Sequence, residues 1–259
     1  MTQTAMVNYH VKSPSAQAFR FDVDGKIGNL VSPELETTRV DVLDLRHEPG
    51  SITFESDGIS FENHTSAIKT FEGSGWRNTY DAELASLLKK TLGAEEVVVF
   101  DHTVRVDDSA AERKPARNVH NDYSEPAAQK RLVDILGESR ARLFSRGRYA
   151  FVNVWRPVEN AITSSPLGFI RPSSVSPDDW MPIELIYPDR RGQILGVAAN
   201  QAHEWFYLSH MTPDEVAIFN IYDSAGQPFL GHSALDMPGD NTTTVPRKSI
   251  ESRTLVRYP

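Results

Sequence analysis

Apolar residues recur at helical spacing in two stretches of this 259-residue chain. In Thr79–Leu92 they fall on one helix face, and Gly93 follows as a stop signal. In Pro126–Phe144 the leucines and Ile135 share one side in the same way. The spacing therefore predicts two helices.

Strand-like runs dominate the rest of the chain, with Pro and Gly between them, such as a turn at Pro49 and Gly50. These runs are Val40–Leu45, Ser51–Phe54, Glu96–Val106, Tyr149–Trp155, Ile183–Tyr187, Ile194–Ala198, Glu204–Leu208, Val216–Tyr222 and Ser249–Tyr258. Many short strands beside two helices predict a mainly β fold, a double-stranded β-helix (jelly roll) core with flanking α-helices. No linker divides the chain, so we expect a single domain over 1–259, in which 1–55 wraps a catalytic core of 56–259.

Composition narrows the function classes. The net charge is −8, and the basic residues are scattered, which argues against a nucleic-acid surface. The chain has no Cys, so a metal would be held by imidazole and carboxylate. It has neither a membrane-spanning run of about 18 apolar residues nor a signal-like N-terminus, which predicts a cytoplasmic protein without a membrane partner.

His120, Asn121 and Asp122 form a His-x-Asp pattern. Residues two apart in a strand point to the same face, so the imidazole and the carboxylate can converge on one ion. Two His and one carboxylate on one face, with open positions opposite, is typical of non-haem Fe(II) oxygenases. The third ligand must come from His203, His210 or His232, and the context of His232 fits best.

That context is an Arg-x-Ser pattern, Arg247 and Ser249, which begins 15 residues (247 − 232) after His232. A guanidinium forms a bidentate pair with a carboxylate, and a hydroxyl adds a further hydrogen bond. A dicarboxylate cosubstrate that chelates iron at one end needs such an anchor at the other. Arg253 shares the same strand face and competes for this role, and a merely charged edge strand would look similar.

These patterns resemble a family of hydroxylase/desaturases that includes the fungal gibberellin desaturase and the hydroxylase of cephamycin 7α-methoxylation. The resemblance runs from about Asp57 to Tyr258. Its matching pieces are Tyr80–Gly93, Val99–Arg105, Val119–Tyr123, Asn153–Pro157, Met211–Glu215, Tyr222–Ser224, His232–Ala234 and Arg247–Arg253. The sequence of Val158–Ser173 departs from the family pattern, so the resemblance does not identify the substrate.

The resemblance implies an Fe(II)/2-oxoglutarate-dependent dioxygenase that hydroxylates, desaturates or otherwise oxidises a small natural product, releasing succinate and CO2. It carries His120, Asp122 and His232 over as metal ligands and supports Arg247 and Ser249, or Arg253, for the cosubstrate. The expected cofactors are thus Fe(II) and 2-oxoglutarate, and the partners are a small-molecule substrate and O2. A homodimer is left open.

Aromatic and polar strand residues are the candidates for the substrate pocket. They are Asn153, Trp155, Arg156, Trp205 and Tyr207, although aromatic pairs more often fill a core. Two other functions compete: a cupin-type metal dioxygenase without 2-oxoglutarate, and a non-catalytic β-sandwich binding module. The Arg-x-Ser pattern argues against the first and the His-x-Asp pattern against the second.

Overall fold

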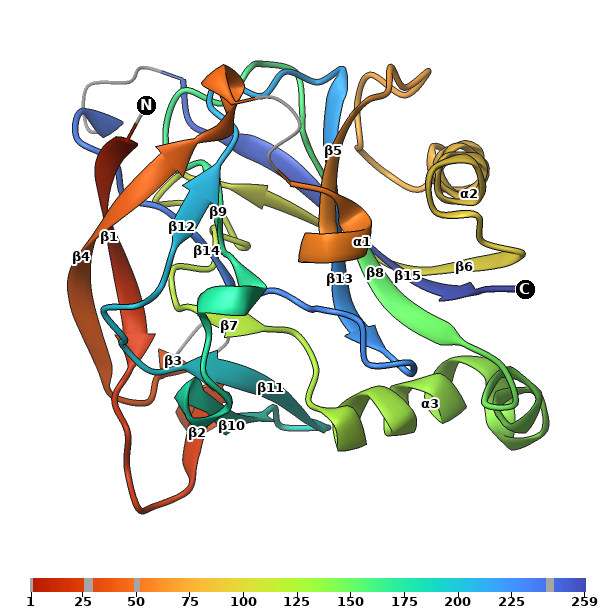
Figure 1. Ribbon diagram of the computed structural model, residues 1–259, viewed down its shortest axis with the longest axis horizontal. Coiled ribbons are helices and arrows are strands. Elements are labelled where there is room, and N and C mark those ends of the chain that lie inside the picture. Colours follow the sequence, from red (N-terminus) through yellow and green to blue (C-terminus); the bar gives the residue numbers. More distant parts are fainter. Residues whose placement is uncertain (1, 26–29, 49–51, 241–244) are drawn as a thin grey trace.

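Two packed β-sheets form the body of the protein in the computed structural model, which describes residues 2–25, 30–48, 52–240 and 245–259. The larger sheet has the order β1-β4-β12-β9-β14-β7-β11-β10-β2-β3 and curls strongly, and the smaller has the order β5-β13-β8-β15-β6 (Figure 1). The larger sheet comprises β1 Thr2–His10, β2 Gln17–Phe21, β3 Leu30–Val31, β4 Leu35–Asp44, β7 His120–Asn121, β9 Leu167–Ile170, β10 Trp180–Ile186, β11 Arg191–Val197, β12 Trp205–Tyr207 and β14 His232–Ala234. The smaller comprises β5 Ile59–Asn63, β6 Glu96–Val106, β8 Tyr149–Pro157, β13 Glu215–Asp223 and β15 Lys248–Arg257.

Three α-helices flank the sheets: α1 Phe54–Asp57, α2 Arg77–Leu92 and α3 Glu125–Phe144. Helix α2 ends where Gly93 takes a left-handed conformation, φ 68°, and packs its apolar side on the outer face of the smaller sheet. Helix α3 begins at Ser124, whose side chain accepts a hydrogen bond from the Ala127 N–H, and is interrupted at Gly137. Within the described residues no helix is long and apolar enough to cross a membrane.

The main core lies between the sheets. Phe169 and Phe206 of the larger sheet meet Phe151, Trp155 and Phe219 of the smaller sheet, and each of these side chains is buried. Because side chains alternate along a strand, these inward residues leave their neighbours, such as Val152 and Val154, to pack outward against α2.

A second core fills the curl of the larger sheet. Strand β1 pairs with β4 along its length, and its free edge meets the segments beside β14 and β7 through bridges from Met6 to Asp236 and from Asn8 to Asn118. The enclosed side chains are Ala5, Val7, Tyr9, Val42, Val119, Ile170, Val197, Trp205, Tyr207 and Leu235. The β1 edge is therefore largely covered by the protein's own backbone.

The mainly β architecture, the two long helices and most of the expected strands are confirmed. The first 55 residues differ from the expectation, because they supply β1 to β4 of the larger sheet rather than a surface wrap. The turn expected at Pro49 and Gly50, with Ser51, lies outside the described residues. The strand expected up to Phe54 is wrong at its described end, where α1 begins.

Candidate metal centre

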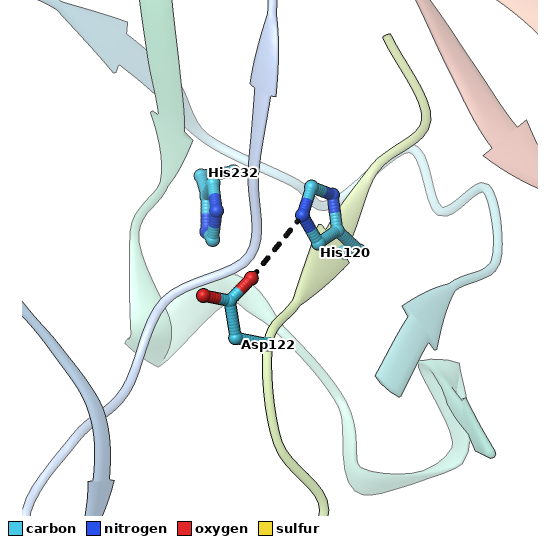
Figure 2. Close-up of side chains that lie close together, drawn as sticks. All are labelled: His120, Asp122 and His232. Carbon is cyan, nitrogen blue, oxygen red and sulfur yellow. Dashed lines mark ion pairs between the residues drawn. The ribbon is translucent and has the colours of Figure 1, made fainter. Parts of the chain in front are cut away.

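The His-x-Asp residues lie at the middle of the larger sheet. Strand β7 is two residues long and pairs with β14 on one side and β11 on the other. His232 of β14 is the direct register partner of His120, so both imidazoles rise from the same face of the sheet. His120, Asp122 and His232 each offer a ligand atom, all within 4.8 Å of one another, and their side chains point toward a common centre (Figure 2).

The two histidines are oriented in the same way. Nδ1 of His120 lies 2.8 Å from the carbonyl oxygen of Asn118, and Nδ1 of His232 lies 3.3 Å from that of Leu230. A carbonyl oxygen only accepts, so in both rings Nδ1 carries the proton and donates. Each Nε2 therefore presents its lone pair, which is the form in which histidine binds a metal.

The Asp122 carboxylate is held from one side. Its Oδ2 accepts hydrogen bonds of 2.9 Å from the Asn153 amide and from Nε of Arg253. Its Oδ1 lies 3.5 Å from Nε2 of His120, the pair marked in Figure 2. One oxygen is thus fixed by the protein, and the other faces the two imidazoles.

Burial and charge set the protonation of this group. Burial, followed by the neighbouring His120, lowers the pKa of His232 to about 3, so this imidazole is neutral over the ordinary pH range. Burial alone would raise the pKa of Asp122, but the charge of Arg253 holds it well below its usual range. Two imidazoles and one carboxylate face each other, which is the donor set that Fe(II) takes in non-haem oxygenases.

Arg247 directly precedes β15 and is buried without a carboxylate partner among the described residues. Its guanidinium donates to the Ser165 carbonyl and to the Ser249 hydroxyl, and lies over the Trp155 ring at 5.1 Å. No carboxylate of the described residues lies within ion-pair distance of it. Burial, followed by the charge of Arg105, lowers the pKa of Arg247 to about 9. A buried cation without an anionic partner is unfavourable, so this environment favours binding of an anionic ligand.

Arg253, in contrast, is paired with three carboxylates. Its Nε bonds to Asp122, its Nη1 lies 2.8 Å from Asp101, and its Nη2 pairs with Glu251. All three nitrogens are thus committed to carboxylates of the protein itself.

Known proteins are similar to this chain in fold and in sequence. A family model described as "Oxidoreductase/YMDC permease-like domain" matches residues 7–257. The hydroxylase/desaturase efuI of Hormonema carpetanum is 28% identical, over 98% of this chain and 97% of its own. The Fe(II)/2-oxoglutarate-dependent dioxygenase nvfI of Aspergillus novofumigatus is 30% identical, over 79% of this chain and 75% of its own. A solved structure of the iron and alpha-ketoglutarate-dependent endoperoxidase NvfI has a TM-score of 0.88 at 25% identity, covering 99% and 98% of the two chains.

The chain belongs to this oxidoreductase family and is an Fe(II)/2-oxoglutarate-dependent dioxygenase. The hydroxylase/desaturase resemblance and the dependence on iron and 2-oxoglutarate are confirmed. A cupin-type dioxygenase without 2-oxoglutarate and a non-catalytic binding module are both excluded.

The dioxygenase does not bring all of the expected pocket residues to the triad. Trp205 and Tyr207 lie in the second core, on the opposite face of the larger sheet, where the Trp205 indole N–H donates to the Tyr9 hydroxyl. Arg156 lies on the outer face of the smaller sheet, over the Tyr80 ring and beside His64. Asn153 faces the triad, while Trp155 lies beneath Arg247.

The alternative histidine ligands are also elsewhere. His203 lies between Tyr9 and Asp179 in a buried hydrogen-bonded chain, and His210 is exposed at a turn. The acid–histidine group found among the described residues is that of His120, Asp122 and His232.

Sequence reasoning missed a neighbour of the triad, His10. Gly196 is the register partner of His120 on β11, and a Cβ there would meet Cδ2 of His10 at 2.6 Å. Glycine thus leaves room for a buried imidazole on the triad side of the sheet. Nothing in the sequence signals this, because it depends on the end of β1 crossing β11.

Proposed function

We propose that this dioxygenase binds its iron through His120, Asp122 and His232 and oxidises a small natural product. The observation that carries the ligand assignment is the convergence of two lone-pair imidazole nitrogens and one carboxylate oxygen within 4.8 Å. An iron ion held by these residues would, with 2-oxoglutarate and O2, supply the chemistry for oxidising the substrate, with release of succinate and CO2. The protein holds the ligands in place and keeps bulk water out of a buried centre.

We further propose that Arg247, with the Ser249 hydroxyl, binds the distal carboxylate of 2-oxoglutarate. Arg247 is buried, it has no acidic partner among the described residues, and Trp155 fixes its plane. A carboxylate there would gain two charge-assisted hydrogen bonds and would neutralise a cation already removed from water. Arg253 lacks this capacity, since Asp122, Asp101 and Glu251 already occupy it.

The proposed substrate is largely apolar. Phe169 and Phe219, both buried, pack against the His232 ring with centroids 6.3 and 5.1 Å away, so the triad has an aromatic side. The net charge of −8 disfavours polyanions. Relatives named as a hydroxylase/desaturase and an endoperoxidase support oxidation of such metabolites, with the outcome set by how the substrate lies.

The ligand assignment is tested by metal content. We expect His120→Ala, Asp122→Ala and His232→Ala each to lose stoichiometric Fe(II) when loaded under anaerobic conditions. His203→Ala is the matched control, because that imidazole is equally buried but bonded to Tyr9 and Asp179. Full iron binding by His232→Ala would refute the assignment.

The reaction is tested by product analysis. The iron-loaded protein is incubated with 2-oxoglutarate, O2 and a panel of terpenoid and polyketide natural products, and succinate and oxidised products are followed by mass spectrometry. Succinate formation that no panel member stimulates would count against a small apolar substrate. A cytoplasmic location and a homodimer remain predictions, for cell fractionation and analytical ultracentrifugation to test.

A further inference from the structure

Strands β6 and β15 are neighbours, and their inner faces carry a ladder of charged residues. Arg105 of β6 is the direct register partner of Ser249, and Asp107 follows it opposite Arg247, whose carbonyl accepts the Asp107 N–H. Toward the triad, Thr103 lies opposite Glu251 and Asp101 opposite Arg253. Arg105 therefore lies beside the Arg-x-Ser pair, on the face that looks into the site.

The acidic groups of this ladder are already paired. Asp107 accepts hydrogen bonds from Arg117 and from the Ser165 hydroxyl, and Glu251 and Asp101 both pair with Arg253. Arg105 donates to the Lys114 carbonyl, and within the described part of the chain no carboxylate lies within 4.0 Å of it. Among the described residues, neither of the two neighbouring guanidinium groups, Arg105 and Arg247, thus forms a direct ion pair.

The charge of Arg105 interacts both with the metal-ligand candidate Asp122 and with Arg247. Burial lowers its pKa, and the charges of Glu251, Arg253 and Asp122 all act on it, while its own charge acts on Arg247. Two like charges in a poorly hydrated place repel each other unless an anion lies between them. A cosubstrate that spans the iron and Arg247 would bring a carboxylate to that place.

We propose that Arg105 is a second guanidinium of the site that binds the distal carboxylate of 2-oxoglutarate. The inference rests on the proposed role of Arg247 and adds a residue from a different strand. One arginine would meet the carboxylate along β15 and the other from β6, so the anion joins two strands of the same sheet. Without the anion, the pair destabilises the protein by repulsion.

The test compares 2-oxoglutarate with 2-oxopentanoate, in which a methyl group replaces the distal carboxylate. Both are titrated by calorimetry into Ni(II)-loaded protein, so no turnover intervenes. We expect Arg105→Met to weaken 2-oxoglutarate binding by about tenfold or more, as for loss of one charge-assisted hydrogen bond, and to leave 2-oxopentanoate binding unchanged. Arg191→Met, which removes an exposed charge on β11 of the larger sheet, should change neither.

Thermal unfolding gives a second readout. Arg105→Met should unfold at the same temperature as the parent protein or higher when no cosubstrate is present, because a repulsion is removed. It should also gain less stability from saturating 2-oxoglutarate. A residue that only supports the fold would instead lower the unfolding temperature and keep the ligand-induced gain. Arg105→Lys, which keeps the charge, should restore part of the preference for 2-oxoglutarate and covers the case in which the methionine variant does not fold.

The outcomes separate the two proposals. An unchanged preference for 2-oxoglutarate in Arg105→Met, with a lost preference in Arg247→Met, overturns the role of Arg105 and leaves the Arg247 anchor in place. If the parent protein itself does not prefer 2-oxoglutarate over 2-oxopentanoate, the anchor fails as well.

Discussion

Replacing Arg253 by methionine tests whether this arginine serves the metal ligands rather than the cosubstrate. The substitution keeps an unbranched apolar stem and removes the guanidinium. It frees Asp122, Glu251 and Asp101 from their common partner. Asp101 is 42% exposed and can be hydrated, whereas the side chains of Asp122 and Glu251 are 8% and 7% exposed and cannot.

The expected loss follows from those two buried carboxylates. Removing one partner of a buried ion pair costs about 3–5 kcal/mol, because a charge stays in a poorly hydrated place. For a chain of this size, each kcal/mol lowers the unfolding temperature by roughly 2–4 °C. We therefore expect Arg253→Met to unfold about 6–20 °C below the parent protein, both measured without metal.

The assay is differential scanning calorimetry of the metal-free proteins, with Arg191→Met as the matched control. Arg191 is 75% exposed and lies 4.0 Å from Glu184, so its loss should change the unfolding temperature little. Arg253→Met should also bind Ni(II) more weakly, because Asp122 is no longer oriented. An Arg253→Met protein as stable as the control, yet unable to bind 2-oxoglutarate, would refute this reasoning and make Arg253 the anchor.

Three further predictions concern the surroundings of the triad and the acid stability of the fold. Gly196→Ala places a Cβ 2.6 Å from the His10 ring and should destabilise the protein by about 1–3 kcal/mol in urea unfolding. Asn153→Ala removes one of the two hydrogen bonds to Oδ2 of Asp122 and should weaken metal binding by about 10- to 100-fold in chelator competition. Burial alone would raise the pKa of Asp44, but hydrogen bonds from the backbone N–H groups of Arg46 and Ser209 lower it. The stability that this carboxylate contributes is present above about pH 4 and lost below it, so Asp44→Asn should show a shallower loss in urea unfolding between about pH 4 and pH 2.

The local pattern of the sequence predicted the features that depend on strand period. His120 and Asp122 share a face because they are two residues apart, and the same period places Ser249 and Arg253 together on β15, with Arg247 just before the strand and bonded to Ser249. The helix over Thr79–Leu92 followed from its apolar spacing and from Gly93. Each of these features is set within about one turn or one strand, where sequence and geometry are directly linked.

The features that failed depend on which face of a strand turns inward. Alternation showed correctly that Trp205 and Tyr207 share a face, but it did not show that Phe206, between them, is the residue facing the main core. Both faces of β12 are buried, because β1 and β4 close a second core over the larger sheet. A strand covered on both sides has no polar face to mark its outside.

The choice between Arg247 and Arg253 shows how the fold assigns different tasks to residues of the same kind. Arg253 lies on β15 and Arg247 directly before it, at the same two-residue spacing, and no local pattern separates them. They differ in what the neighbouring strands place opposite them: Asp101 and Asn153 flank Arg253, while Ser165 and Trp155 surround Arg247. A guanidinium surrounded by the protein's own carboxylates orients a metal ligand, and one that faces only a carbonyl, a hydroxyl and an aromatic ring keeps its charge for a ligand. We therefore propose that the supply of acidic partners from adjacent strands distinguishes Arg253, which supports a metal ligand, from Arg247, which is free to bind the cosubstrate.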